Sequence, residues 1–343
     1  MSGSFPEHGL LAVARVISET IDATTIEIDV PADRQAVYAG RAGQFVRILI
    51  PGDPEQHSRS YSLSSTPELE EPLRFTVKRV VGGAVSERLT RTLSQGDYLR
   101  VDPPAGAFTL RDSSDPLVLI AGGSGITPLF SLLKAALKLT DRPVTLLCAH
   151  RNQDAAIFAG LIAEYQRSHP ERLSVRHHHS DESGFLTESD VIDLLTSHQR
   201  AQIYLCGPAP LMDLVEKVFD AHCPADRYEL FCERFLSPTL VSNGEARDAP
   251  ETVACNVVVR ISGEDFSFPW SGPGSLLDDA LTAGVPMPHS CRDGHCGACK
   301  ARLVEGDVEQ DGALALSKRD HQKKNILACC SRPRSPSLVL DYD

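Results

Sequence analysis

A set of cysteines near the C-terminal end constrains this 343-residue chain more than any other feature. Three of them follow the spacing Cys291-x4-Cys296-x2-Cys299, and a fourth, Cys329, comes after 29 further residues. Three thiolates on one loop and a fourth from a distant segment are the arrangement that holds the two irons of a 2Fe-2S cluster. The chain must therefore fold so that Cys329 returns to the loop of the first three.

The residues between these cysteines suit such a loop. Gly294, Gly297 and Ala298 keep side chains away, so that backbone N–H groups can point at the sulfur atoms. A structural zinc site is the alternative, but zinc modules usually present two short Cys-x2–4-Cys pairs. The neighbour Cys330 is a second thiol at the fourth position. On an extended chain adjacent side chains point to opposite sides, so we expect one of the two to face the irons.

Charge and hydropathy exclude several classes of protein. The net charge is −12, from 34 Lys and Arg against 46 Asp and Glu, whereas a nucleic-acid binder presents a basic surface. Residues 1–6 lack the basic and then apolar stretch of a signal peptide. The longest uncharged run, 117–133, falls short of the roughly 20 apolar residues of a membrane-spanning helix. We expect a cytoplasmic protein that binds no nucleic acid and has no membrane span.

Three patterns predict a multidomain chain. Residues 1–112 contain short β-branched runs between turn residues, which predicts an antiparallel β-barrel. Residues 113–236 alternate apolar strands with helices, as in a doubly wound parallel α/β sheet. The polar stretch 237–250 is interpreted as a linker, and 251–343 as a third domain.

Apolar periodicity also predicts the elements of each domain. The first has the expected helix Val85–Leu93 and the strands Leu10–Ser18, Thr25–Val30, Phe45–Ile50, Leu73–Val80 and Tyr98–Val101. In the second, the expected strands are Leu117–Ala121, Val144–Ala149, Leu173–His177, Gln202–Cys206 and Tyr228–Cys232. The helices between them are Leu129–Leu139, Ala155–Arg167, Glu188–Leu195 and Leu211–Ala221. The third domain has the expected strands Val253–Ile261 and Ser337–Leu340.

Two motifs in the first domain suggest a flavin site. The string Arg59-Ser60-Tyr61-Ser62 offers a cation and a stacking aromatic ring. The expected helix opens with two glycines and a serine, whose N–H donors and positive dipole end suit a phosphate: Gly82, Gly83 and Ser86. Each motif alone is weak, and an ordinary strand with an exposed arginine is the alternative for the first.

The second domain has a glycine-rich turn directly between a strand and a helix. In the run from Gly122 to Pro128, glycines precede the helix at the edge of the sheet where a dinucleotide pyrophosphate binds. Because Pro128 replaces the third glycine of G-x-G-x-x-G, the motif is of moderate specificity. Cys206-Gly207-Pro208 also follows a strand end and is expected to line the same crevice.

Taken in order, these motifs resemble the ferredoxin–NADP reductase superfamily, over essentially the whole chain from Leu10 to Tyr342. Within it, the chain is similar to oxygenase reductase components with a C-terminal plant-type ferredoxin domain. Those of 3-ketosteroid 9α-hydroxylase and phenylacetyl-CoA epoxidase are examples. The resemblance implies a β-grasp fold (α+β) for the third domain. It also favours Cys329 as the fourth cluster ligand, since the family pattern Cys-x3-Pro is met by Pro333.

The resemblance implies roles for residues of the flavin domain. Arg59 would contact flavin phosphate, Tyr61 would stack on the isoalloxazine, and Ser62 would hydrogen-bond near its N5. The FAD pyrophosphate would be held by Gly82, Gly83 and Ser86. We favour FAD over FMN because the FMN-binding group carries a different glycine pattern.

The resemblance also implies roles in the nucleotide domain. Cys206 would lie beside the nicotinamide, and Glu233 and Phe235 belong to the acid-x-Phe segment that approaches the flavin. The residues facing the pyridine nucleotide would be Gly123, Gly125 and Thr127. Ser62, Cys206 and Glu233 are therefore the expected catalytic residues.

The function implied is a reductase in which electrons pass from NADH to FAD, then to the 2Fe-2S cluster, and then to a transiently bound terminal oxygenase with a Rieske or di-iron centre. NADH is favoured over NADPH because Arg151 stands alone, with Asp154 nearby, where a 2′-phosphate needs several cations. Two alternatives stay open. One is a redox or oxygen sensor without an oxygenase partner, and the other is a structural zinc protein.

Some residues that attract a functional interpretation have a simpler one. Adjacent histidines on a strand alternate faces, so His177–His179 is expected to be a strand end without a metal role. Four single cysteines are expected to be small buried apolar residues: Cys148, Cys223, Cys232 and Cys255. Trp270 is expected to pack inside the third domain.

Overall fold

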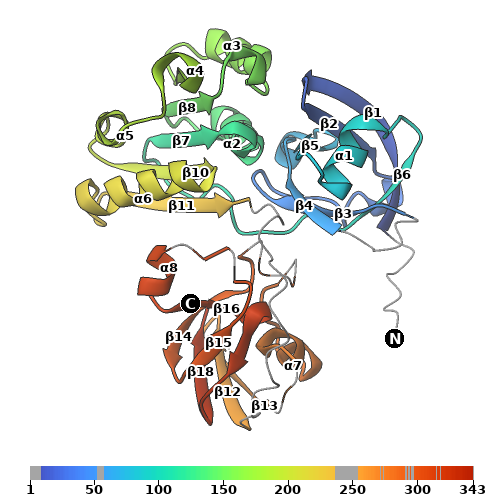
Figure 1. Ribbon diagram of the computed structural model, residues 1–343, viewed down its shortest axis with the longest axis vertical. Coiled ribbons are helices and arrows are strands. Elements are labelled where there is room, and N and C mark those ends of the chain that lie inside the picture. The colour runs from blue at the N-terminus through green and yellow to red at the C-terminus, as the bar shows by residue number, and fades with distance from the viewer. Residues whose placement is uncertain are drawn as a thin grey trace. The chain divides into compact units, whose positions relative to one another are not determined.

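The structure is a computed structural model, and it describes residues 9–51, 58–235, 254–270, 272, 274–289, 292, 294, 297–313, 315–316 and 318–342. The chain forms two compact units, Met1–Glu233 and Arg234–Asp343, each described by itself below (Figure 1). The expected linker 237–250 lies outside the described residues.

The first part of the N-terminal unit is a six-stranded antiparallel sheet in the order β4-β3-β6-β1-β2-β5. A bridge between Leu63, which follows β4, and Phe75 of β5 joins the two edges and closes the sheet into a barrel. The strands are β1 (Leu10–Thr20), β2 (Ala23–Asp29), β3 (Phe45–Leu49), β4 (Ser58–Ser62), β5 (Leu73–Lys78) and β6 (Tyr98–Val101).

The helix α1 (Ala84–Arg91) packs against the barrel core through Val85 and Leu89, which are fully buried. The expected strands and helix of this domain lie within a few residues of those observed. The strand β4 was missed because its sequence, SRSYS, has no apolar run to mark it.

The second part of the N-terminal unit is a five-stranded sheet in the order β11-β10-β7-β8-β9. The pairs β7–β10, β7–β8 and β8–β9 are parallel, as expected for a doubly wound fold. The strands are β7 (Leu117–Gly122), β8 (Val144–His150), β9 (Leu173–His179), β10 (Ala201–Gly207) and β11 (Tyr228–Arg234). The helices are α2 (Ile126–Leu139), α3 (Ala159–Ser168), α4 (Ser180–Ser183), α5 (Glu188–Leu195) and α6 (Ala209–His222).

Both faces of this sheet are covered, which explains why β7 is apolar at every position. Leu117 and Leu119 belong to the same buried cluster as residues of α2 and α3. Val118 and Ile120 belong to a second cluster with residues of α5 and α6. Figure 1 shows these helices around the central strands. A strand buried on both faces has no polar alternation, so the continuous apolar run predicted it correctly.

The helix expected over Ala155–Arg167 begins later than predicted. Asn152 caps a 3-10 turn over Gln153–Ala155 through its side chain, and Phe158 then takes a left-handed conformation with φ 62°. The chain therefore turns before α3 starts at Ala159. The apolar spacing does not show this interruption because Ile157 and Phe158 are buried in the loop itself.

The helix α2 connects the barrel to the parallel sheet through hydrogen bonds and an ion pair. The Ser131 hydroxyl donates to the Ser65 carbonyl, and the Thr66 hydroxyl donates to the Ser131 carbonyl at 3.1 Å. Lys134, 5% exposed, forms an ion pair with Glu71. Burial lowers the pKa of Lys134, and the hydrogen bond to Glu71 opposes that shift.

The C-terminal unit contains a five-stranded mixed sheet in the order β13-β12-β18-β14-β16. Helix α7 (Leu276–Thr282) buries Leu276, Leu277 and Ala280 in the same cluster as residues of this sheet. The strands of the mixed sheet are β12 (Cys255–Ile261), β13 (Glu264–Trp270), β14 (Lys300–Glu305), β16 (Asn325–Leu327) and β18 (Ser337–Asp341). A second sheet pairs β15 (Val308–Gln310) with β17 (Ser331–Pro333), and a short helix α8 covers Lys318–Gln322.

Several single-residue expectations are decided by burial. Trp270 is 2% exposed and donates from its indole N–H to the Gly274 carbonyl, which confirms its packing in this unit. Cys148, Cys223 and Cys255 are buried as expected, but Cys232 is exposed and that prediction was wrong.

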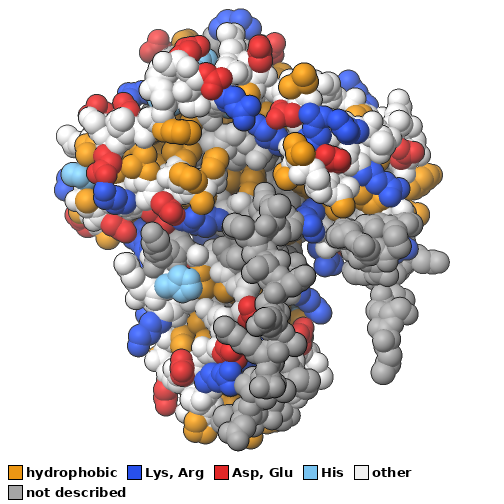
Figure 2. All heavy atoms as spheres, viewed as in Figure 1, with side chains coloured by type: hydrophobic (Ala, Val, Ile, Leu, Met, Phe, Trp, Pro, Cys, Tyr) orange, Lys and Arg blue, Asp and Glu red, His pale blue; other side chains and the backbone are white. Residues whose placement is uncertain are grey.

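Among the described residues, no helix is long and apolar enough to cross a membrane. The face seen in Figure 2 carries acidic and basic side chains side by side rather than in patches of one sign.

The buried ion pair between α2 and the barrel gives a test of this packing. We expect Lys134→Ala to lower the free energy of unfolding by about 2 kcal/mol, because Glu71 is left half-buried without its counter-ion. Replacing both partners, as in K134M/E71L, should recover most of that loss. Urea denaturation of the holoprotein measures both. Lys138→Ala, on an exposed position of the same helix, is the control. An equal loss in Lys134→Ala and Lys138→Ala would contradict the prediction.

Candidate functional site

Three residues from three strands converge in the N-terminal unit. Ser62 is the last residue of β4, Cys206 lies at the carboxyl end of β10, and Glu233 lies near the end of β11. The Ser62 hydroxyl donates to a carboxylate oxygen of Glu233 at 2.8 Å, across 171 positions of the sequence. Both Ser62 and Cys206 are buried, at 2% and 0% exposure.

The surroundings of this group alter its acid–base behaviour. Burial raises the pKa of Glu233 to about 7, and the hydrogen bond from Ser62 partly opposes that shift. Burial also raises the pKa of the Cys206 thiol well above its usual value, and the nearby Glu233 carboxylate and Cys232 add to the effect. Near neutral pH, Cys206 therefore stays a neutral thiol, whereas Glu233 exchanges a proton.

The other residues of the first motif lie on the same strand, β4. The Tyr61 ring stacks on Phe75, with 5.6 Å between the ring centroids and 21° between the ring planes. Arg59 donates from its guanidinium to the Ser58 carbonyl at 2.6 Å. Tyr61 is partly exposed, and one side of its ring has a partner within the barrel.

The start of α1 has the character of an anion site. Gly83 is the N-cap residue, and the Gly82 N–H is held by the carboxylate of Glu87 at 3.0 Å. The Ser86 hydroxyl accepts from the Val80 N–H at 3.1 Å and so fixes the turn. The sequence did not single out Glu87, because it lies four positions after the N-cap Gly83, whereas the capping-box pattern places the acid three positions after it. The Glu87 carboxylate lies at the N-terminal end of α1, whose positive dipole would also attract a phosphate.

The glycine-rich turn after β7 lies directly against the end of β10. A Cβ atom on Gly125 would come within 2.1 Å of the Cys206 carbonyl oxygen, so no other residue fits without moving the backbone. Gly123 and Gly125 form a single 3-10 turn, and the Thr127 hydroxyl at the start of α2 donates to the Ser124 carbonyl at 3.0 Å. Gly125 therefore lies beside Cys206, and Gly123 and Thr127 belong to the same turn and helix start.

In the C-terminal unit, two of the expected cluster ligands lie in contact. The sulfur atoms of Cys299 and Cys329 are 3.3 Å apart. Two thiolates on one tetrahedral metal lie roughly 3.8 Å apart, so the pair is close to the geometry for binding one iron. Hydrogen bonds from Cys299 and Cys330 and from the Gly294 N–H lower the pKa of Cys329. Cys291 and Cys296 lie outside the described residues.

The backbone at the fourth ligand differs from the prediction. Ala328–Cys330 is a 3-10 turn rather than extended chain, and the sulfur atoms of Cys329 and Cys330 are 3.6 Å apart. Adjacent side chains therefore do not point to opposite sides here, and that argument was wrong. Cys329 is nevertheless the one that contacts Cys299, while the Cys330 sulfur lies 3.7 Å from the Gly312 carbonyl.

The loop around Gly294 fits a metal–sulfur group. Gly294 has φ 72°, and a Cβ there would lie 2.1 Å from the Gly312 carbonyl oxygen and 2.7 Å from the Cys330 sulfur. Its N–H points at the Cys329 sulfur, at 3.3 Å, and such bonds stabilise thiolates and sulfides.

Phe235 belongs to the same C-terminal unit and is 38% exposed.

Comparison with protein families assigns each region. Residues 10–110 match the family described as an oxidoreductase FAD-binding domain, and 119–217 match the oxidoreductase NAD-binding domain. Residues 259–334 match the 2Fe-2S iron-sulfur cluster binding domain. The N–H groups at the start of α1 fit FAD, and those of the turn after β7 fit a pyridine nucleotide. The thiols of Cys299 and Cys329 fit a 2Fe-2S cluster.

Known proteins match along the whole chain. The chain is 32% identical over 344 residues to the ferredoxin reductase component of 3-ketosteroid-9-alpha-monooxygenase from Rhodococcus rhodochrous, covering 97% of this chain and 96% of that one. It is 28% identical over 357 residues to one of the subunits of 1,2-phenylacetyl-CoA epoxidase from Escherichia coli, covering 97% of each.

Solved structures agree. Phthalate dioxygenase reductase, described as a modular structure for electron transfer from pyridine nucleotides to 2Fe-2S, matches with a TM-score of 0.60 and 26% identity over 97% of both chains. CYP116B46 from Tepidiphilus thermophilus matches with a TM-score of 0.73 and 27% identity, and there the chain spans 41% of that longer protein. The chain belongs to the ferredoxin–NADP reductase superfamily, among the oxygenase reductase components with a C-terminal 2Fe-2S ferredoxin domain.

Proposed function

We propose that this oxidoreductase takes a hydride from NADH and delivers single electrons to a terminal oxygenase. The observation that carries the proposal is the convergence of Ser62, Cys206 and Glu233 beside the glycine-rich turn. It brings β4, the strand of the proposed flavin motif, to the strand end where we propose that the nucleotide binds. When bound, FAD accepts the hydride and the 2Fe-2S cluster takes up electrons one at a time.

The residues of the chain orient and enclose these groups. The Glu233 carboxylate accepts a hydrogen bond from the Ser62 hydroxyl and so fixes where that side chain points. We propose that Ser62 holds the flavin ring near its N5 and that Cys206, a neutral thiol, packs beside the nicotinamide. The close approach of Gly125 to the Cys206 carbonyl supports a pyridine nucleotide bound at that edge of the sheet. Such positioning determines hydride-transfer rates because small misplacements are costly.

We propose further binding roles on the same basis. Arg59 and Tyr61 would bind the flavin phosphate and ring, with the FAD pyrophosphate held by Gly82, Gly83 and Ser86. The pyridine nucleotide would face Gly123, Gly125 and Thr127. The cluster would be ligated by Cys291, Cys296, Cys299 and Cys329, and Phe235 would lie in the segment that approaches the flavin.

The proposed domains are 1–112, 113–236 and 251–343, and the proposed location is the cytoplasm.

NADH is proposed over NADPH because of the segment that follows β8. Arg151 and Asp154 are both exposed there, and Asn152 is occupied with capping the 3-10 turn and with the Asp181 carboxylate at 3.0 Å. A 2′-phosphate needs a cluster of cations, and an acid beside a single arginine opposes it.

The proposed partner is a terminal oxygenase with a Rieske or di-iron centre, bound transiently. The named relatives are components of a ketosteroid monooxygenase and a phenylacetyl-CoA epoxidase, which supports a partner of this class. A redox sensor without an oxygenase partner is the second candidate, and it predicts slow turnover.

The experiment that tests the function is an anaerobic stopped-flow mixing of the holoprotein with NADH, followed by steady-state reduction of ferricyanide. We expect rapid bleaching of the flavin, then of the cluster, and a kcat/KM for NADH at least about 10-fold above that for NADPH. Flavin reduction that is slow with both nucleotides would favour the sensor. A higher kcat/KM for NADPH would overturn the choice of nucleotide.

Ser62 can be tested separately from flavin binding. We expect Ser62→Ala to lower the rate of flavin reduction by NADH about 10-fold while FAD stays bound, because the hydroxyl acts on orientation. Ser60→Ala is the matched control, since Ser60 lies on the same strand but is exposed. Equal rates in Ser62→Ala and the wild-type protein would contradict the proposed role.

The raised pKa of Glu233 predicts a pH-dependent stability. Its carboxyl group has a pKa of about 7 in the fold against 4.5 when unfolded, so the folded state loses stability as the pH rises through 7. Glu233→Gln removes this loss. Relative to the wild-type protein, the variant should gain about 2 kcal/mol of unfolding free energy between pH 5.5 and pH 8.5. Urea denaturation at the two pH values measures it, and a constant difference would show that Glu233 does not titrate near neutrality.

The fourth cluster ligand is testable by two neighbouring substitutions. Cys329→Ser should abolish or severely weaken the cluster absorbance and its reduced-state EPR signal, because the Cys329 sulfur is the one in contact with Cys299. Flavin reduction by NADH should continue. Cys330→Ser should keep both cluster signals. The reverse pattern would move the assignment to Cys330.

A further inference from the structure

A cysteine and three histidines share one face at the carboxyl ends of β8 and β9. In the parallel register of these strands, Cys148 pairs with His177 and His150 pairs with His179. Alternate residues of a strand point to the same face, and paired residues of neighbouring strands do so too. The two strands therefore place all four side chains on one side of the sheet.

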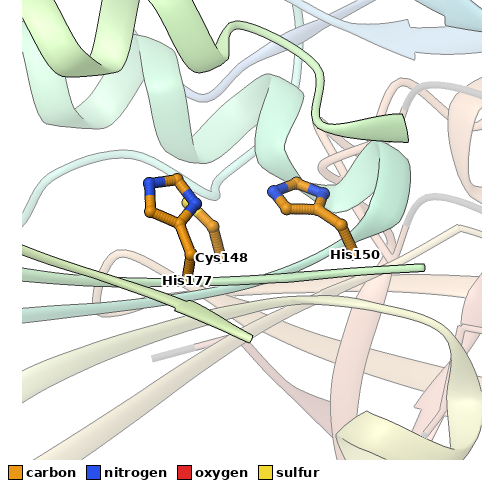
Figure 3. Close-up of side chains that lie close together, drawn as sticks. All are labelled: Cys148, His150 and His177. Atoms are coloured by element: carbon orange, nitrogen blue, oxygen red, sulfur yellow. The ribbon is translucent and has the colours of Figure 1, made fainter. Parts of the chain in front are cut away.

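Three of these side chains lie close together. The sulfur of Cys148 and ring nitrogens of His150 and His177 all lie within 4.8 Å of one another. Figure 3 shows the His177 ring beside the Cys148 sulfur and the His150 ring on the same side of the strands. From the sequence we expect no metal role for His177–His179, because adjacent histidines on a strand alternate faces. That expectation does not consider which residues the neighbouring strand contributes.

His150 has an unmet requirement in this position. It is 5% exposed, and both of its ring nitrogens are buried with no hydrogen-bond partner. A buried polar atom without a partner is costly, and native structures usually satisfy it. The Cys148 thiol beside it is fully buried as well.

We propose that Cys148, His150 and His177 bind a divalent transition-metal ion of the zinc type. One thiolate and two imidazoles are the ligands that zinc prefers, and binding releases the thiol proton to solvent. His177 is exposed and provides the path of entry. His179, whose ring nitrogen lies 3.6 Å from a Glu182 carboxylate oxygen, or a water molecule completes the tetrahedron. Lys78 is a neighbouring cation, and Asp22 pairs with it at 3.7 Å.

This site is separate from the 2Fe-2S cluster and does not depend on the proposed electron-transfer function. The ion would join the ends of β8 and β9, at the same carboxyl edge of the sheet as the turn that follows β7.

Equilibrium dialysis of the holoprotein against buffered zinc chloride tests the proposal, with zinc and iron counted together by mass spectrometry. We expect one zinc per two irons in the wild-type protein, with the ratio of iron to FAD unchanged. His177→Gln, a substitution at an exposed position, should weaken zinc binding at least about 10-fold. His178→Ala is the matched control, because its ring is occupied by the Gly184 carbonyl at 2.8 Å, and it should bind zinc as the wild type does.

A second readout identifies the sulfur ligand. Cobalt(II) added to the holoprotein should give a thiolate-to-cobalt charge-transfer band in the near-ultraviolet difference spectrum, and Cys148→Ala should lack it while keeping bound FAD. The proposal is overturned if the wild-type protein takes up no zinc, or if zinc enters only as iron is lost. It is equally overturned if His177→Gln binds zinc as tightly as His178→Ala.

Discussion

The arrangement of the N-terminal unit depends on one close backbone contact, between the glycine-rich turn after β7 and the end of β10. The Cys206 carbonyl oxygen occupies the space that a Cβ on residue 125 would need, at 2.1 Å. Because residue 125 is glycine, the first turn of α2 can reach the strand end directly. The start of α2 and the end of β10 then lie together, at the edge of the sheet where doubly wound folds bind a dinucleotide.

The same helix also sets the distance to the flavin domain. Thr127 lies at its start and binds the glycine-rich turn, whereas Ser131 and Lys134, one and two turns later, bind the barrel at Ser65 and Glu71. A shift of α2 would therefore move both the nucleotide turn and the barrel. The hydrogen bond between Ser62 and Glu233 depends on that alignment, since its two residues come from the barrel and from β11. The alignment of Ser62 with Glu233 thus depends on the packing of α2 against the barrel.

The two proposed metal sites show opposite relations between sequence and structure. At the cluster, three ligands lie within nine residues, so their spacing alone identifies the chemistry. At the ends of β8 and β9, Cys148 and His177 are distant in sequence and become neighbours only through the register of two parallel strands. A one-residue slip in that register would move the histidines to the other face. No local pattern contains this information.

The sequence by itself determined the three domains' character, the 2Fe-2S ligand spacing and the strands that are buried on both faces, such as β7 and β10, because each is written in a short local pattern. Only the tertiary structure decided the existence of β4, whose polar sequence is held in place by pairing with β3. It also replaced extended chain by a 3-10 turn at Ala328–Cys330. Finally, it brought Ser62 into hydrogen-bond contact with Glu233. It also buried His150 so that neither ring nitrogen has a hydrogen-bond partner. These features depend on contacts between residues far apart in the chain, whose geometry follows from strand register and helix packing rather than from local preference.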